Sequence, residues 1–174
     1  MAKAAAETLK RQGVSVEKLV VSPLQRTKES AAPWQELFGL TATEEDRIIE
    51  PWNQFEGYPM GYRSLLSRPA LALKLYNPMK PSWGEPFSQI QKRMQEAALH
   101  HAADSAADVV FVSHQLPIEM LYRSASGLSL AHNPRQRRTT LSSITSFEIR
   151  DGKLVEVDYQ EPGMELKRKL EVGA

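Results

Sequence analysis

The sequence predicts an α/β fold, a three-layer α/β/α sandwich around a mostly parallel sheet, and two repeated patterns carry this prediction. Apolar runs at Leu19–Val21 and Val109–Val112 contain no polar residue, which is typical of parallel strands buried on both faces. Each run leads within a few residues through a serine and a proline into a helical pattern. Proline is tolerated in the first turn of a helix because its missing N–H would have no partner there. Strand–helix units of this kind build parallel sheets.

Composition indicates one globular domain. The chain has 174 residues, of which 41% are hydrophobic and 25% charged, and its formal net charge is +1. That length is enough for one full core, so we expect residues 1–174 to form a single domain. The small net charge gives no reason to expect nucleic acid or a membrane as a partner, and no apolar run is long enough to span a bilayer or resembles a signal peptide. Without cysteine there is no disulfide or thiolate site, and we expect a cytoplasmic protein.

Helix formers and turn residues predict the other elements. We expect helices over residues 2–12, 24–38, 86–107 and 117–126, and the end of a third short strand at Arg47–Glu50. Alternating segments at Ser143–Arg150 and Lys153–Tyr159 flank Asp151-Gly152, which predicts a C-terminal β-hairpin with a type I′ turn. The segment 51–86 is rich in proline and glycine. We expect it to be an insert or lid that sets substrate specificity.

Three reactive side chains fall at the ends of predicted strands, namely Arg26, Glu50 and His114. Ligands of parallel sheets bind at the carboxyl ends of the strands, and helix N-termini attract anions. Arginine binds phosphate oxygens bidentately, a protonated histidine adds charge, and a carboxylate can serve as general acid or base. Each residue alone is more often structural. Their matching positions predict a phosphate pocket with an adjacent proton donor.

Other chemistries fit less well. Ser113 lies in no Gly-x-Ser-x-Gly motif and has no evident separate base, which disfavours a serine hydrolase. His100 and His101 are adjacent, so on a helix they point roughly 100° apart and cannot chelate one metal ion together. We expect no metal ion and no cofactor. The basic run Arg135–Arg138 could recognise a second acidic group of a ligand, but a solvated loop is the favoured interpretation.

Four motifs resemble those of the histidine phosphatase (phosphoglycerate mutase-like) superfamily. Ser22-Pro23-Leu24-Gln25-Arg26-Thr27 resembles its Ser-Pro-Leu-x-Arg-Ala segment, Ile48 to Gly57 its acid/base glutamate segment, Gly84-Glu85 with Arg93 its Gly-Glu-Ser…Arg segment, and Val112 to Ile118 its second-histidine motif. Gln115-Leu116 is similar to the actinobacterial branch of the family. The resemblance runs from about residue 2 to 160, with the motifs in the family's order.

The resemblance implies a phosphohistidine mechanism acting on a small phosphorylated substrate. One histidine attacks phosphorus, a glutamate protonates the leaving oxygen and then activates water, and two arginines and a second histidine hold the phosphoryl oxygens. Carried over by motif, Arg26 is a phosphate clamp, Glu50 the acid/base and His114 the second pocket histidine. Glu56 is the alternative acid, and Ser22 and Gln115 are secondary candidates.

The family's nucleophile lies in an Arg-His-Gly motif at the end of its first, central strand, and none of the four histidines here has that context. The chain also begins inside a helical pattern with no N-cap residue. We therefore expect an N-terminally truncated domain that lacks about 25 to 40 residues, including the central strand. The expected function is phosphomonoester hydrolysis. We expect this chain to be inactive, because it lacks the nucleophilic histidine. The alternatives are mutase-type phosphotransfer and non-catalytic binding of a phosphorylated ligand.

Overall fold

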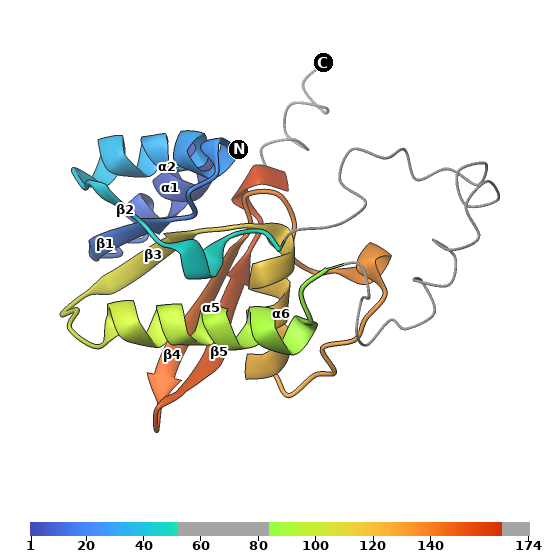
Figure 1. Ribbon diagram of the computed structural model, residues 1–174. Coiled ribbons are helices and arrows are strands. Elements are labelled where there is room, and N and C mark those ends of the chain that lie inside the picture. The colour runs from blue at the N-terminus through green and yellow to red at the C-terminus, as the bar shows by residue number, and fades with distance from the viewer. Residues whose placement is uncertain (52–83, 165–174) are drawn as a thin grey trace, which may run out of the picture.

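The computed structural model describes residues 1–51 and 84–164 (Figure 1). Along the chain the elements are α1 (Ala2–Arg11), β1 (Val16–Val21), α2 (Gln25–Phe38), β2 (Ala42–Glu44), the 3₁₀ helix η1 (Asp46–Ile48), α5 (Phe87–Ala102), β3 (Asp108–Val112), α6 (Gln115–Ala125), the 3₁₀ helix η2 (Pro134–Gln136), β4 (Ile144–Arg150) and β5 (Lys153–Gln160). The four predicted helices are confirmed, with ends that differ by a few residues. Most of the expected insert at 51–86 lies outside the described residues, and so does Glu56. Among the described helices, none is long and apolar enough to cross a membrane.

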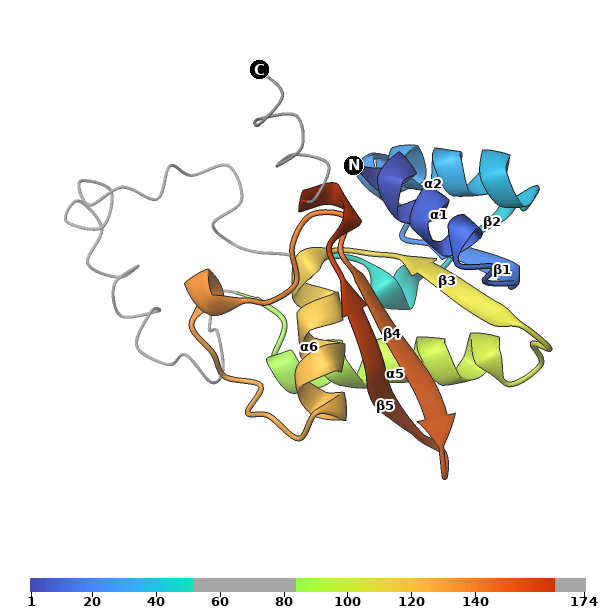
Figure 2. The ribbon, with the colours of Figure 1, turned by 180° about the vertical axis from the view of Figure 1, so that it is seen from behind.

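A parallel sheet with the strand order β2-β1-β3 lies between two layers of helices. Helices α1 and α2 lie on one side of this sheet and α5 and α6 on the other (Figures 1 and 2). Successive residues of β1 divide between the two sides, because side chains alternate along a strand. Val20 packs with α5 and α6, whereas Leu19 and Val21 pack with α1 and α2. The predicted α/β/α sandwich is confirmed.

The C-terminal hairpin is also confirmed. Strands β4 and β5 pair antiparallel from Ile144 opposite Gln160 to Arg150 opposite Lys153. Asp151 and Gly152 connect them with φ values of 51° and 71°. A type I′ turn requires positive φ at both central residues, so this dipeptide selects the tight connection.

Strand β3 departs from the prediction that it would be buried on both faces. Its residues Val109–Val112 are only half-buried, although side chains of β3 pack into both helix layers. Among the described strands, β3 pairs only with β1, and β4 pairs only with β5. The edge of β3 away from β1 therefore has no described strand beside it. The unbroken apolar run correctly predicted covered faces, but it carries no information on how many strands lie beside it.

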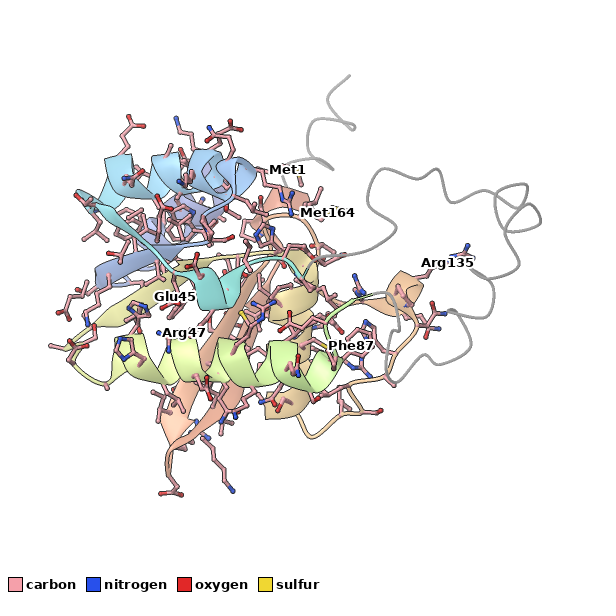
Figure 3. The ribbon with its side chains drawn as sticks, viewed as in Figure 1. Met1, Glu45, Arg47, Phe87, Arg135 and Met164 are labelled. Carbon is pink, nitrogen blue, oxygen red and sulfur yellow. The ribbon has the colours of Figure 1, made fainter. Side chains whose placement is uncertain are left out.

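The predicted strand end at Arg47–Glu50 is wrong. The third parallel strand is β2, and the chain turns immediately after it into η1. Glu45 causes this turn, because its carboxylate accepts a hydrogen bond from the backbone N–H of Arg47 at 3.0 Å and pairs with the Arg47 guanidinium at 2.7 Å. Figure 3 shows both residues at this bend. Glu50 lies in the irregular segment beyond η1.

Candidate active site

The junction between β1 and α2 is fixed by hydrogen bonds from both sides. The backbone N–H of Ser22 donates to the Val112 carbonyl at 3.1 Å, which extends the pairing of β1 with β3 by one residue. The Thr27 hydroxyl is a donor that lies 2.8 Å from the Ser22 carbonyl and 2.6 Å from the Leu24 carbonyl, so it holds the turn that leads into α2. Arg26 lies in the first turn of α2, and its side chain is 58% exposed.

The junction between β3 and α6 places a histidine at a helix N-terminus. His114 is the N-cap residue of α6, in extended backbone conformation, and its side chain is only 4% exposed. The preceding residue, Ser113, donates its hydroxyl to the Ile48 carbonyl at 2.7 Å. This bond ties the segment that leads into Glu50 to the end of β3.

The three residues predicted for the pocket converge at these junctions. Arg26 Nε lies 3.2 Å from His114 Nδ1. Glu50 Oε2 lies 3.5 Å from the same ring nitrogen and 4.0 Å from an Nη atom of Arg26. Glu50 therefore reaches the predicted place although it does not end a strand. A cation, an imidazole and a carboxylate meet beside the N-terminus of α6.

Hydrogen bonding assigns the tautomer of His114. Arginine has only donors, so the bond from Arg26 requires an unprotonated Nδ1. The proton is then on Nε2, which donates to the Ser22 hydroxyl at 2.8 Å. Burial, followed by the charges of Arg26 and Arg93, lowers the pKa of His114 from 6.5 to about 4. The ring is therefore neutral at pH 7, and its contact with Glu50 is not an ion pair. The expectation of a protonated histidine concerns a pocket that holds phosphate, and it stays a prediction.

Arg93 on α5 holds the segment that carries Glu50. Its guanidinium donates to the Arg47 carbonyl at 2.5 Å and to the Ile49 carbonyl at 2.7 Å. The same group pairs with the Glu85 carboxylate, with Nε to Oε1 at 2.9 Å. These contacts occupy all three nitrogens of the guanidinium. The Glu85 and Arg93 motif is thus a support behind the pocket.

Arg137, in the basic run after α6, contacts Gln115, the residue that directly follows His114. Its Nη1 donates to Gln115 Oε1 at 3.4 Å and its Nε to His132 Nε2 at 2.9 Å. Burial lowers the pKa of Arg137, and the negative charges of Glu50 and Glu119 offset this in part. Sequence reasoning favoured a solvated loop here, because a run of four residues with three arginines does not tell which of them turns inward.

Other chemistries gain no support. The Ser113 hydroxyl is donated to a backbone carbonyl. Ser22 contacts a histidine but is fully buried, so no substrate carbonyl can reach it. Within residues 1–51 and 84–164, no group of three or more histidine, aspartate or glutamate side chains is placed to hold a metal ion.

Comparison with known proteins agrees with this geometry. A sequence model of the Histidine phosphatase superfamily (branch 1) matches residues 1–162. The chain belongs to the histidine phosphatase superfamily. Among sequence relatives, the uncharacterized protein Rv0525 of Mycobacterium tuberculosis H37Rv is 39% identical over 146 residues, which are 83% of this chain and 72% of that protein. The uncharacterized protein MT0547 of M. tuberculosis CDC 1551 is 38% identical over the same shares of both chains.

Solved structures share the histidine phosphatase fold at lower identity. A mycobacterial glucosyl-3-phosphoglycerate phosphatase, Rv2419c, in complex with inorganic phosphate is 20% identical, with a TM-score of 0.69 over 92% of this chain and 82% of that one. Bacillus stearothermophilus YhfR is 17% identical, with a TM-score of 0.69 over 89% of this chain and 78% of that one. These similarities establish the fold.

Proposed function

We propose that the chain carries the phosphoryl-binding pocket of a phosphomonoester hydrolase that works through a phosphohistidine intermediate. The observation that carries this proposal is the convergence of Arg26, His114 and Glu50 within 4.0 Å at the carboxyl ends of β1 and β3. Phosphate fits such a place because the guanidinium matches its oxygens and the N-terminus of α6 favours negative charge.

Each pocket residue has a distinct part. Arg26 binds phosphoryl oxygens through its exposed Nη groups. A bound phosphate dianion beside His114 favours the protonated ring, because an opposite charge stabilises the charged form. The imidazolium then donates a second charged hydrogen bond to the phosphoryl group. Glu50, on the same side of the ring, protonates the leaving oxygen and then takes the proton of the attacking water.

The nucleophile of this reaction is, in our proposal, absent from the 174 residues. His100 and His101 lie in the last turn of α5, and both ring nitrogens of His132 have partners. His114 accepts from Arg26 through Nδ1 and donates to Ser22 through Nε2, so neither ring nitrogen has a free lone pair with which to attack phosphorus. Within residues 1–51 and 84–164, β3 has no second partner strand beside β1 and β4 has none beside β5, which is compatible with this part of the proposal. Upstream genomic DNA with no in-frame Arg-His-Gly codons would argue against this part.

Phosphatase action is favoured over mutase action by the phosphatase named among the structural neighbours, Rv2419c. Non-catalytic binding is the second candidate, because the histidines of this sequence include none in an Arg-His-Gly motif. Both share the pocket. For the chain as it stands, they predict the same result, which is phosphate binding without turnover.

Calorimetric titration with inorganic phosphate tests the pocket, and Arg26→Ala is the informative variant. Loss of a charged hydrogen-bond donor of this kind costs about 2 kcal/mol, so the Kd should rise by roughly 30-fold. Lys28→Ala is the matched control, because Lys28 lies on the same helix and pairs with Glu44 at 2.7 Å outside the pocket. Equal phosphate affinities for the two variants would contradict the proposal. Turnover of p-nitrophenyl phosphate at an ordinary enzymatic rate would contradict the proposal that this chain lacks the nucleophile.

A further inference from the structure

One edge of the Arg26 guanidinium faces two acceptors of the chain itself. Nε lies 3.2 Å from His114 Nδ1, and Nη2 lies 4.0 Å from Glu50 Oε2. Nε and Nη2 are a pair of nitrogens with which arginine binds a phosphate or a carboxylate bidentately. The Glu50 carboxylate therefore lies where an oxygen of a phosphoryl group would meet Arg26.

The charge of Arg26 holds Glu50 beside His114. Glu50 Oε2 lies 3.5 Å from His114 Nδ1. This ring nitrogen accepts the bond from Arg26, and a carboxylate oxygen is an acceptor as well, so the two atoms have no proton to share. Their approach is stabilised by the guanidinium that faces both of them. A ligand that takes over the guanidinium would therefore also loosen the contact between Glu50 and the ring.

The ion pair between Arg26 and Glu50 is loose compared with its neighbour behind the pocket. Arg93 and Glu85 pair at 2.9 Å, and the Arg93 side chain is largely buried. Arg26 and Glu50 are 4.0 Å apart, with side chains that are 58% and 32% exposed. Long, exposed ion pairs contribute little to stability. The Arg93 pair is thus a permanent support, whereas the Arg26 pair is weak enough to exchange with an anion from solution.

Glu50 can leave Arg26 without a change of its backbone. The carbonyl of Ile49 accepts from Arg93 at 2.7 Å, and the carbonyl of Ile48 accepts from the Ser113 hydroxyl at 2.7 Å. The two residues before Glu50 are therefore fixed from both sides. Exposed side chains change rotamer rapidly, so rotation of the Glu50 side chain is enough to move the carboxylate away from Arg26 and back.

We propose that Glu50 competes with the phosphoryl group for Arg26 and thereby promotes the release of inorganic phosphate. The inference rests on the proposed function and adds a regulation of the same site. In the proposed hydrolysis, Glu50 takes a proton from the attacking water and is neutral when inorganic phosphate has formed. Loss of this proton to solvent restores the carboxylate, which pairs with Arg26 again as the phosphate leaves. No covalent bond other than this O–H bond changes in the release step.

Calorimetric titration with inorganic phosphate tests the competition. Glu50→Gln keeps the shape of the side chain and removes its charge, so the Kd of phosphate should fall by about 5-fold, the size expected for one partly exposed charge pair. Glu44→Gln is the matched control, because Glu44 pairs with Lys28 of α2 at 2.7 Å outside the pocket and loses the same charge. This control should change the Kd by less than about 2-fold.

The same substitution in a chain without Arg26 separates competition from plain charge repulsion. In the Arg26→Ala background, Glu50→Gln should change the Kd of phosphate by less than about 2-fold, because the group for which the carboxylate competes is gone. An undiminished gain in this background would overturn the proposal. Should Glu50→Gln lower the Tm, Glu50→Ala removes the same charge and should give the same gain in affinity.

The outcomes distinguish this inference from the proposed function. If inorganic phosphate binds to the wild-type chain and Glu50→Gln binds it no more tightly, the competition is refuted and the phosphate pocket stands. Tighter binding by Glu50→Gln, with an unchanged Kd for Glu44→Gln, supports both. If phosphate binds neither to the wild-type chain nor to Glu50→Gln, the pocket and the competition fail together.

Discussion

The two strand–helix junctions of the pocket share one sequence layout but present opposite side chains. After β1 the chain gives a serine, a proline and then Arg26, whose side chain is 58% exposed and carries a permanent charge. After β3 it gives a serine and then His114, whose side chain is 4% exposed and neutral at pH 7. In the pocket that we propose, the exposed junction attracts the anion, and the buried junction supplies a histidine whose charge depends on the ligand.

The serines of the two junctions explain how this difference arises. Ser22 is fully buried and accepts from the His114 ring, so the first junction fixes the histidine of the second. Ser113 points the other way and holds the carbonyl of Ile48, in the segment that carries Glu50. Each serine therefore places a residue from another part of the chain. The pocket is assembled by contacts between the junctions rather than within either one.

The largest expected effect concerns the segment that the two junctions share. Arg93→Ala should lower the free energy of unfolding by about 3 kcal/mol, because it leaves the Glu85 carboxylate unpaired in a site where the arginine side chain is 16% exposed. It also removes the donors to two backbone carbonyls. Urea unfolding measures the change. Lys92→Ala, at a side chain that is 76% exposed, is the control and should change stability by less than about 0.5 kcal/mol. Equal midpoints for the two variants would contradict this role of Arg93.

The next effect is a loss of stability in acid that depends on the buried junction. The folded-state pKa of His114 is about 4 against 6.5 for an ordinary histidine, so between these values the unfolded chain binds more protons than the folded one. Stability should therefore fall as pH drops from 6.5 toward 4, by on the order of 3 kcal/mol in total, at 1.36 kcal/mol per pH unit. His114→Asn should flatten this part of the curve of unfolding free energy against pH. An equally steep curve in the variant would assign the acid sensitivity to other groups.

The serines should give the smallest effects, and unequal ones. Ser22→Ala leaves the buried Nε2–H of His114 without its acceptor and should cost about 2 kcal/mol of unfolding free energy. Ser113→Ala removes a donor to a half-buried carbonyl and should cost about 1 kcal/mol. Thermal unfolding of the two variants ranks them. The reverse order would mean that the Ser22 contact with the histidine is not what holds the ring.

Local patterns explain which parts of the fold could be predicted. Apolar runs that end before a proline gave β1, β3 and the helices after them, and Asp151-Gly152 gave the hairpin, because each depends on residues adjacent in sequence. The Ile48-Ile49 pair suggested a strand, but Glu45 caps the Arg47 N–H and bends the chain first. A pattern of hydrophobic residues does not show when a side-chain hydrogen bond to the backbone will end a strand.

The candidate site divides in the same way. Arg26, His114 and Glu50 were all predicted because each follows a predicted strand, and the family motifs include the same residues. The strand before Glu50 was wrong, but Glu50 still lies within 4.0 Å of Arg26 and His114. The placement of Arg137 beside the N-terminus of α6 could not be predicted, because it depends on His132 and Gln115, contacts that form only in the folded chain. Glu56 stays a prediction, since it lies outside the described residues.

Titration of the His114 ring by NMR tests the central claim most directly. Without ligand, the ring should titrate near pH 4, since burial and two arginines favour the neutral form. With saturating phosphate, the added negative charge should raise the pKa of His114 above about 6. Arg26→Ala should raise it as well, by removing one of the two positive charges. A ring that titrates at the same pH with and without phosphate would contradict a phosphoryl pocket at this place.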